Sequence, residues 1–343
     1  MKVLLGMSGG VDSTFAVYEL RKMGYEVHGA VIKMHNYTEI EEAKLSADAL
    51  GVPLHILDAA DLFSEKVIAS FMSEYKKGRT PNPCIVCNSE VKFKLLFDFA
   101  GENGFDKIAT GHYADIVKIS EGDENRYALK RSEDSRKDQT YMLWRLPQEI
   151  LAKLVFPLSN LTKDSVKKKA EEMNLRAAFR GESQEICFIP DGNYAEYIEE
   201  RMGKSPEGNF VDESGKVLGR HKGIIHYTVG QRKGLGISLG ERAFITSINP
   251  ENNDITLRVN DSYSVGFTVS DMVFSGIVEQ ACGTSMDVLV KHRYLAPLMP
   301  ARIFFMEKGR ARVEFSEPIR AVTPGQSAVF YKDGIVLAGG IID

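Results

Sequence analysis

The sequence lacks the features of a membrane or secreted protein. None of its uninterrupted apolar runs approaches the roughly 18 residues needed to cross a bilayer. The opening MKVLLGMSGG has too short an apolar stretch for a signal peptide and no cleavage site after it. Four cysteines among 343 residues do not make a disulfide scaffold. We therefore expect a cytoplasmic protein with no membrane partner, whose cysteines are buried, catalytic or metal-bound.

A basic excess is also missing. The formal net charge is −4, and residues 1–200 carry 26 Lys and Arg against 32 Asp and Glu, whereas residues 201–343 carry 17 against 15. Nucleic-acid binding depends on a local basic face rather than on the total charge, so this balance neither supports nor excludes such a partner. With 43% hydrophobic residues the chain can form an ordinary core, which excludes a disordered protein.

The first 115 residues alternate short β-type runs with segments of helical periodicity. We expect strands at 2–5, 27–32, 54–57 and 107–110, and helices at 13–23, 40–50, 61–74 and about 89–103. Strands separated by helices of about 10–15 residues indicate parallel βαβ units. The pattern predicts an α/β doubly wound parallel sheet, with a ligand at the carboxyl ends of its strands.

Beyond about residue 205 glycine becomes frequent and short β-type runs replace helices. The last part of the chain alternates apolar and polar residues in runs such as 311–315, with turn signals at 324–325 and 333–334. This pattern indicates a small antiparallel barrel or sandwich. We predict a first domain over 1–202, a small central β-rich domain over 203–270 and a C-terminal antiparallel β-barrel over 271–343.

A Gly- and Ser-rich turn, GMSGGVDST at 6–14, lies between the first expected strand and helix. Glycine N–H groups and a helix N-terminus together favour anion binding. The Walker A pattern fails because Val11 and Asp12 stand where it requires Gly and Lys, and the Rossmann spacing is also absent. The turn instead resembles the SGGxDS signature of the PP-loop ATP pyrophosphatases, which split ATP between the α and β phosphates and adenylate an oxygen of their substrate.

That resemblance implies roles for the polar side chains of the turn. Ser8, Ser13 and Thr14 would donate hydrogen bonds to phosphate oxygens. Asp12 would hold Mg²⁺ or shape the loop, since a carboxylate repels phosphate directly. The plainer alternative is a Gly-rich turn capped by Ser8 or Ser13.

Two cysteines form a C-x-x-C pair in TPNPCIVCN at 80–88, just before the helix expected from Ser89. A thiol at a helix N-terminus has a lowered pKa. Cys187 lies in SQEICFIP at 183–190, and we expect the isolated Cys282 to be an inert, small buried hydrophobe. A C-x-x-C pair fits zinc, a redox dithiol or a cluster, but zinc needs four ligands and no second pair exists. A phosphate loop combined with reactive thiols points to sulfur transfer onto an adenylated oxygen.

The chain resembles the bacterial tRNA-specific 2-thiouridylase family over essentially its whole length. The resemblance rests on eight segments in the family's order: GMSGGVDS at 6–13, TPNPCIVCNSEVKFK at 80–94, TGHYA at 110–114, KDQTYML at 137–143, PLSNLTKDSV at 157–166, SQEICFIPDGNY at 183–194, GRHKGIIHYTVGQRKGLGI at 219–237 and KHRY at 291–294. Members convert the wobble uridine of certain tRNAs to 2-thiouridine, using ATP to adenylate the oxygen at C2 and a persulfide to supply the sulfur. The resemblance implies ATP and Mg²⁺ as cofactors, and as partners a tRNA with a modifiable wobble uridine and a sulfur donor (a cysteine desulfurase, a relay protein or free sulfide).

The family's two catalytic positions fall on Cys87, the nucleophile, and Cys187, which bears the persulfide. The resemblance implies that the persulfide attacks C2 while adenylate leaves. The other thiolate then frees the product and leaves a Cys87–Cys187 disulfide, or it helps to release hydrosulfide. Either route requires the two sulfurs to meet, so the loop around Cys187 should be mobile or close when tRNA binds.

The same resemblance implies the binding residues. ATP would contact Gly6, Met7, Ser8, Gly9, Gly10, Val11, Asp12, Ser13, Met34 and Gly111. Chemistry at C2 cannot happen inside a base stack, so the target base is flipped, and it would be lined by Asn82, Pro83 and Cys84. The tRNA would contact His112, Lys137, Asp138, Gln139, Arg293, Tyr294 and Gln326. The plainer alternatives are a surface residue at His112, a solvated turn at 137–139 and cross-strand packing at 293–294.

Two departures from the family leave alternatives open. Many members have Asp where this chain has Cys84, and with it Cys84, Cys87 and Cys187 make the ligand set of a 4Fe–4S cluster with one iron open to hydrosulfide, a second route to sulfur. Residues 35–42 are brief where members often carry a longer acidic insert, which bears on how a relay partner docks.

Other classes of protein remain in competition. Another PP-loop ligase or amidotransferase would need no cysteine pair. A non-catalytic tRNA-binding module would bind tRNA and release no pyrophosphate. Neither class explains residues 80–94 together with 183–194.

Overall fold

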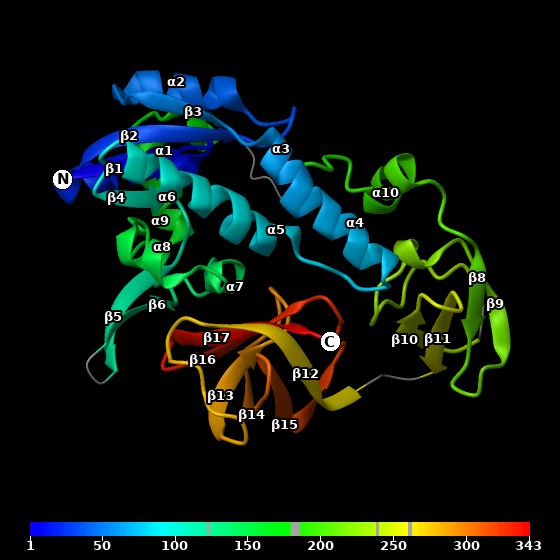
Figure 1. Cartoon of the computed structure of the whole chain (residues 1–343). Helices are drawn as coiled ribbons and strands as arrows, with labels where there is room; N and C mark the ends of the chain where they lie inside the picture. The colour runs from blue at the N-terminus through cyan, green and yellow to red at the C-terminus, as the bar shows by residue number, and fades with distance from the viewer. Residues whose placement is uncertain (122–123, 180–185, 238–239, 260–262) are drawn as a thin grey trace.

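The computed structural model describes residues 1–121, 124–179, 186–237, 240–259 and 263–343. Residues 183–185 of the SQEICFIP segment therefore lie outside the description. The expected fold class is confirmed: a parallel sheet with helices comes first, a small β-rich part follows, and an antiparallel barrel closes the chain (Figure 1). The predicted limits at 202/203 and 270/271 stay predictions.

The parallel sheet has the strand order β3-β2-β1-β4-β7. Its strands are β1 (Lys2–Gly6), β2 (Glu26–Lys33), β3 (Leu54–Asp58), β4 (Lys107–Thr110) and β7 (Leu154–Val155). Successive side chains of a strand point to opposite faces. Val3 and Leu5 accordingly join the core beneath α1 (Val11–Lys22), whereas Leu4 joins the core beneath α6 (Phe93–Glu102). Both faces are covered, as in a doubly wound sheet.

Two long composite helices lie beside the sheet (Figure 1). The first consists of α3 (Ala60–Phe63), the π-type segment η1 (Ser64–Ile68) and α4 (Ala69–Lys76), and the second of α5 (Pro83–Val86), the π-type segment η2 (Cys87–Lys92) and α6. The expected start of the second helix near Ser89 is wrong. Asn82 Oδ1 accepts a hydrogen bond from the Cys84 N–H at 3.1 Å, and Pro83 fits the first turn, so the helix begins there. Both cysteines of the C-x-x-C pair are helical.

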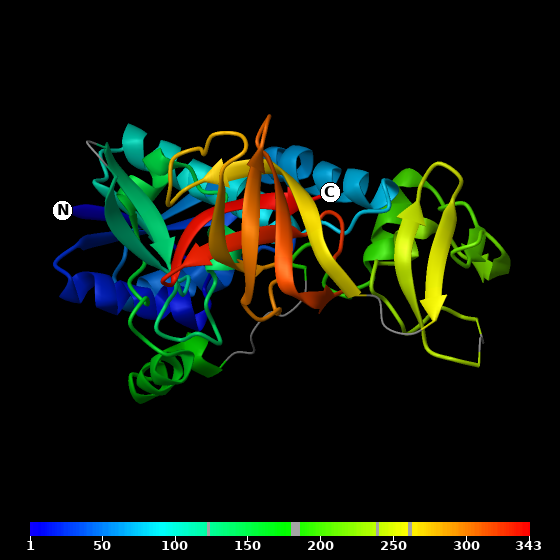
Figure 2. The same cartoon turned by 90° about the horizontal axis from the view of Figure 1, so that it is seen from below.

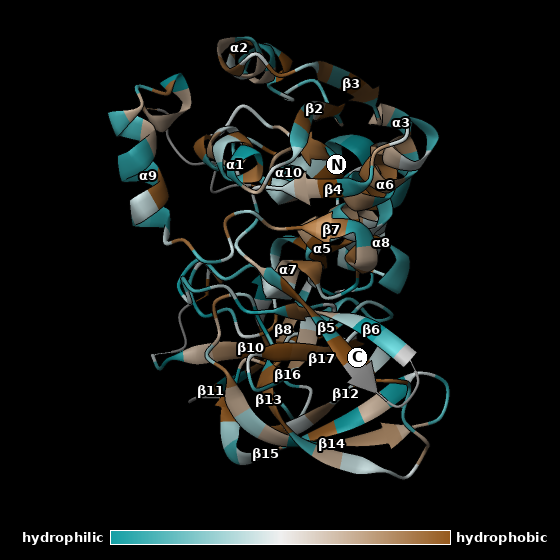
Figure 3. Ribbon diagram, turned by 90° about the vertical axis from the view of Figure 1, so that its left-hand side faces the viewer, coloured by the Kyte–Doolittle hydropathy of each residue, from teal (hydrophilic) through white to brown (hydrophobic). Residues whose placement is uncertain are grey.

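The remaining helices complete the N-terminal part. They are α2 (Ile40–Leu50), α7 (Thr140–Leu143), α8 (Gln148–Lys153), α9 (Lys163–Glu172), η3 (Arg176–Phe179) and α10 (Tyr194–Met202). Figure 3 shows α9 as largely hydrophilic, whereas β7 and β17 (Ile335–Ile342) are mostly hydrophobic. None of the helices in the described ranges has the length and apolar character needed to span a membrane.

The rest of the chain forms a small mixed sheet and an antiparallel barrel. The central sheet has the order β10-β11-β8-β9, with β8 (Gly208–Val211), β9 (Val217–His221), the short helix η4 (Ile224–His226), β10 (Ala243–Asn249) and β11 (Asp254–Val259); one of its pairs, β11–β8, is parallel. The barrel runs β12-β15-β14-β13-β16-β17 and closes by pairing β12 with β17. Its other strands are β12 (Tyr263–Phe274), β13 (Ser285–Lys291), β14 (Met299–Met306), β15 (Arg310–Arg320) and β16 (Ser327–Lys332).

The alternation expected in the barrel is present. On β15, Ala311, Val313 and Phe315 are buried, while the residues between them are exposed. One hairpin was not expected: β5 (Asp115–Glu121) and β6 (Glu124–Lys130) follow β4 and extend the barrel sheet through the pairing of Lys130 with Ile335 (Figures 1 and 2). This hairpin fixes the barrel to the N-terminal part of the chain.

Candidate active site

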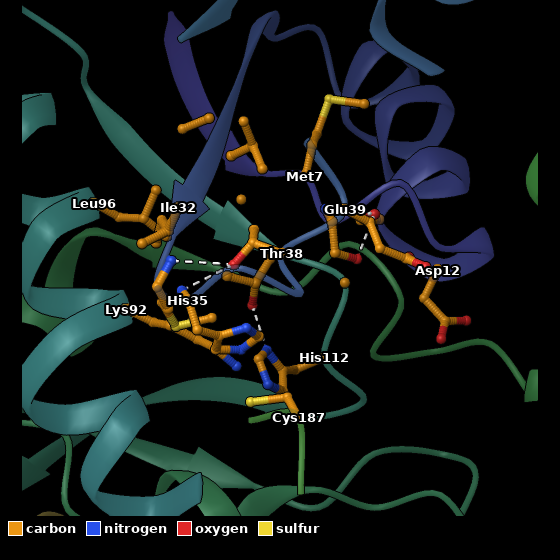
Figure 4. Close-up of a pocket in the computed structure, with 18 of the residues that line it drawn as sticks. Met7, Asp12, Ile32, His35, Thr38, Glu39, Lys92, Leu96, His112 and Cys187 are labelled. Atoms are coloured by element: carbon orange, nitrogen blue, oxygen red, sulfur yellow. Dashed lines mark hydrogen bonds between the residues drawn. The ribbon is translucent and has the colours of Figure 1, made fainter. Parts of the chain in front are cut away.

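A cavity of about 680 Å³ opens at the carboxyl ends of β1, β2 and β4, where a doubly wound sheet binds its ligand. Its wall combines the phosphate loop, the segment after β2, the helix that carries the C-x-x-C pair, the turn after β4 and the Cys187 segment (Figure 4). The expected ATP residues on this wall are Gly6, Met7, Ser8, Asp12, Ser13, Met34 and Gly111. Gly9, Gly10 and Val11, the first residue of α1, are not among its lining residues.

The phosphate loop is held by its own hydrogen bonds. Ser13 Oγ accepts from the Ser8 N–H at 3.2 Å, and the hydroxyls of Ser13 and Thr14 donate to the Gly10 carbonyl at 3.1 and 2.9 Å. Gly9 has a φ of +78°, and a Cβ there would lie 2.8 Å from the Ala43 nitrogen, so only glycine fits. Ser13 and Thr14 are both buried, and their expected contacts with phosphate stay predictions.

The turn after β4 packs directly on this loop. A Cβ on Gly111 would lie 2.8 Å from the Ser13 nitrogen, so the two segments meet through backbone. The Tyr113 hydroxyl donates to Asp12 Oδ1 at 2.9 Å, and Gln139 Oε1 accepts from the Tyr113 N–H at 2.9 Å. Gln139 therefore braces the turn that supports the phosphate loop, besides lining the cavity.

Lys163 is a site residue that sequence reasoning missed. The residue is 7% exposed, and its Nζ lies 2.8 and 2.7 Å from the two carboxylate oxygens of Asp12. Of the two roles expected for Asp12, these contacts favour shaping the loop over holding Mg²⁺. Mg²⁺ usually keeps several waters and is bound through one or two carboxylates and substrate phosphates rather than by a dedicated protein cage, so it would enter this site together with ATP.

The two catalytic cysteines have different surroundings. Cys87 is 4% exposed, and its thiol donates to the Met34 sulfur at 3.5 Å. Burial raises the pKa of Cys87 to about 12, although the charge of Lys92 acts in the opposite direction. The lowered pKa expected from a helix N-terminus is therefore wrong for Cys87, because the helix begins a turn earlier and carries it into the core. Cys187 is exposed as a residue, but its side chain lines the cavity, and desolvation raises its pKa (Figure 4).

All four cysteines are free thiols. Cys84, Cys87 and Cys187 act on Lys92 and on one another electrostatically, so they lie in one neighbourhood. Within the described ranges, however, no three His, Cys, Asp or Glu side chains are grouped to hold a metal ion. The 4Fe–4S cluster, whose thiolates bind different irons and so lie farther apart than the ligands of one ion, stays a prediction. Cys282 is exposed, so the expectation of a buried residue is wrong there.

The segment expected to line the flipped base is clamped by the other parts of the chain. Gln326 Nε2 donates to the Thr80 carbonyl at 2.7 Å, and the Thr80 hydroxyl donates to Thr228 Oγ1 at 3.2 Å. Asn82 caps the helix and donates to the Met142 sulfur at 3.4 Å. Pro83 is buried and Cys84 is exposed, so Cys84 is the member of this segment open to a base.

Several residues expected to contact tRNA are engaged within the protein. Asp138 is 3% exposed and accepts hydrogen bonds from the Thr140 hydroxyl at 3.0 Å and from Arg131 at 3.2 Å. The preceding residue, Lys137, is half-buried. Arg293 donates to the Val229 carbonyl at 3.0 Å, which joins the barrel to the central part. Tyr294 packs against Tyr141. Their roles toward tRNA stay predictions.

Two histidines line the cavity in the neutral form. Burial, helped by the charge of Lys92, lowers the pKa of His112 to about 3, and His112 Nδ1 lies 2.9 Å from Thr110 Oγ1. The same causes lower the pKa of His35, whose two buried ring nitrogens have no hydrogen-bond partner among the residues that the structure describes. His112 thus lies beside Cys187 in the cavity (Figure 4). His35 was not foreseen, because an isolated histidine after a strand carries no sequence signal.

These features define a class of protein: an α/β enzyme of the PP-loop type, with thiols placed at its nucleotide cavity. Comparison with known families agrees with this class. Residues 1–191 match the model of a "tRNA methyl transferase HUP domain", residues 195–258 that of a "tRNA methyl transferase PRC-barrel domain", and residues 264–342 that of an "Aminomethyltransferase beta-barrel domain".

Curated relatives make the family specific. The tRNA-specific 2-thiouridylase MnmA of Acetivibrio thermocellus is 45% identical over 99% of both chains, and that of Clostridium botulinum is 43% identical over 100% of this chain and 98% of its own. The chain belongs to the tRNA-specific 2-thiouridylase family. Among solved structures, a 4-thiouridine synthetase–RNA complex with bound ATP is 18% identical over 58% of this chain and 50% of its own, with a TM-score of 0.40, too low to carry a functional argument.

Proposed function

We propose that this chain is an ATP-dependent tRNA 2-thiouridylase that replaces the C2 oxygen of the wobble uridine by sulfur carried on Cys187. One observation supports this most strongly: Cys187 lines the same cavity as the phosphate loop. An adenylated oxygen held at that loop and a sulfur on Cys187 would thus meet without leaving the cavity. Cytoplasm is the compartment where such a tRNA enzyme would act.

In the first half-reaction the protein binds ATP and the target uridine and orients them toward each other. The N–H groups of the phosphate loop and the N-terminus of α1 would hold the phosphates of ATP, which binds together with Mg²⁺. ATP supplies the adenylyl group for the uridine oxygen. The Lys163–Asp12 pair fixes the loop, and the Gly111 turn packs behind it. The base would enter from the side of Asn82 and Cys84.

In the second half-reaction the terminal sulfur of a Cys187 persulfide attacks C2, and the C2–O bond breaks with AMP as the leaving group. The product is then joined to Cys187 through a disulfide. The Cys87 thiolate attacks the Cys187 sulfur, so that the thiocarbonyl leaves with its electron pair and a Cys87–Cys187 disulfide forms. That disulfide must be reduced by an external dithiol before the next turnover.

The placement of the thiols favours this persulfide route over a cluster. The described cysteines are not grouped as metal ligands, whereas a persulfide needs only Cys187 in the cavity. A cysteine desulfurase or relay protein would supply the sulfur, and the exposure of Cys187 supports loading from outside.

The proposal is tested with purified protein, ATP, a tRNA transcript with a wobble uridine, and a persulfide donor. We expect AMP, pyrophosphate and 2-thiouridine from the wild type, and no 2-thiouridine from Cys187→Ser or Cys87→Ser. Pyrophosphate release that continues unchanged in both variants without any thiolated nucleoside would support a ligase of another kind. Binding of tRNA without pyrophosphate release would support a non-catalytic module. A methylated nucleoside whose formation requires S-adenosylmethionine would instead support tRNA methyl transfer, the activity in the description of the matching family.

A further inference from the structure

Lys92 has an unusual position for a lysine. It ends the π-type segment η2, which begins at Cys87, and it lines the cavity together with Cys187 and the phosphate loop (Figure 4). In a π-type turn residues five apart are hydrogen-bonded neighbours, whereas an α-helix would turn them away from each other. The segment therefore keeps Lys92 on the side of Cys87.

Lys92 supplies the only Lys or Arg side chain on the described wall of the cavity. Lys94, two residues further on, faces solvent and pairs with Asp98 at 2.9 Å. No carboxylate in the described part of the chain forms an ion pair with Lys92. Desolvation works against its charge, but Cys87, Cys84 and Cys187 act in the other direction and raise the pKa of Lys92. A desolvated ammonium without an acidic partner lowers stability, which makes it a candidate for function.

Neither the two histidines nor the carboxylates of the wall, Asp12 and Glu39, can supply this positive charge. Both His35 and His112 are neutral, partly because Lys92 repels a second positive charge. The carboxylate of Asp12 forms an ion pair with Lys163, which is not one of the residues that line the cavity. The ammonium of Lys92 is thus the Lys or Arg charge on the described wall of the cavity that the phosphate loop and Cys187 share.

We propose that the ammonium of Lys92 stabilises the negative charges that arise in the reaction. These are the anionic sulfur at Cys187 and Cys87 and the negative charge on the phosphate group of the departing AMP. This rests on the proposed function, and adds a residue to it. A fixed cation in a water-poor site stabilises developing charge without reorganising at the moment of reaction. Its charge also opposes the rise in the pKa of both thiols that burial causes.

The first test measures the sulfur directly, without ATP or tRNA. The rate of iodoacetamide labelling at Cys187 is followed by mass spectrometry on the tryptic peptide 181–201, whose cleavage sites the variants leave intact. We expect Lys92→Met to slow labelling at least about fivefold, because the thiolate fraction falls faster than nucleophilicity rises. Lys92→Arg should restore most of the rate, and the matched control Lys94→Met should stay within about twofold of wild type.

An unchanged rate in Lys92→Met would overturn the proposal. Thermal unfolding checks that the variants are folded, and Lys92→Gln makes the same comparison if Lys92→Met does not fold. A second readout is thiolation itself: Lys92→Met should lower kcat about 100-fold with the KM for tRNA nearly unchanged. If the wild type thiolates tRNA and labelling is insensitive to Lys92, only this inference fails. If the wild type makes no 2-thiouridine, the proposed function fails whatever the labelling result.

Discussion

The Nζ of Lys163 bridges the two carboxylate oxygens of Asp12, at 2.8 and 2.7 Å. Lys163 is the first residue of α9, and Asp12 lies in the first turn of α1, so the pair joins two helices that are far apart in sequence. Neutralised in this way, Asp12 can remain beside a loop that binds phosphate.

Lys163→Met should therefore impair nucleotide binding. It leaves the Asp12 carboxylate uncompensated at the loop, so we expect the KM for ATP to rise about tenfold and the free energy of unfolding to fall by about 1–3 kcal/mol. Pyrophosphate release at varied ATP and urea unfolding measure the two effects. Lys167→Met, an exposed change on the same helix, is the control; equal KM values in the two variants would show that the pair does not act on ATP.

Cys84 separates the two routes to sulfur. Cys84 is exposed and is not grouped with other ligands of a metal ion in the described part of the chain. Cys84→Ala should therefore retain most of the thiolation activity, within about threefold of wild type. Wild-type protein purified anaerobically should hold far less than one iron per chain. Iron and sulfide analysis beside nucleoside analysis checks this. About four irons per chain, lost together with activity in Cys84→Ala, would establish the cluster instead.

His112 should make stability depend on pH. Its pKa is lowered from 6.5 to about 3 in the folded protein, so below pH 6.5 the unfolded chain binds a proton that the folded protein does not. Stability from the neutral ring is thus present above pH 6.5 and lost as the pH falls toward 3. His112→Gln removes this loss, and the difference in unfolding free energy between wild type and variant should shift in favour of the variant by at least about 1 kcal/mol between pH 7 and pH 4. A constant difference would mean that His112 titrates normally.

Gln326 should hold the segment that carries the C-x-x-C pair. Gln326→Leu removes the 2.7 Å hydrogen bond to the Thr80 carbonyl, so hydrogen exchange over 80–88 should become severalfold faster, while exchange in α2 stays unchanged as an internal control. We also expect a higher KM for tRNA at a nearly constant KM for ATP. Unaltered exchange at 80–88 would show that the barrel does not stabilise this segment.

Local periodicity was sufficient to predict most of the parallel sheet. The helix at Ile40–Leu50 and the strand at Lys107–Thr110 have the bounds expected from sequence, because their apolar spacing and terminal residues are local signals. The start of the cysteine helix was missed because the helix was expected to begin only at Ser89. Asn82 followed by Pro83 is also a helix-start pattern, and the structure uses it in that way.

The rest depended on contacts between distant residues. The hairpin β5–β6 joins a strand about 200 residues further along the chain, and no local pattern specifies such a pairing. No local pattern pointed to Lys92, since an α-helical period turns it away from Cys87 and only the π-type segment reverses this. The raised pKa of Cys87 likewise follows from burial by other elements.

The most direct test of the whole account follows the sulfur atom. The Cys187 persulfide is loaded with ³⁵S, excess donor is removed, and the protein is mixed with tRNA in a single turnover with and without ATP. We predict that label leaves peptide 181–201 and appears in 2-thiouridine only when ATP is present, with a Cys87–Cys187 disulfide formed in equal amount. Label that stays on Cys187 while unlabelled sulfide thiolates the tRNA would contradict the account.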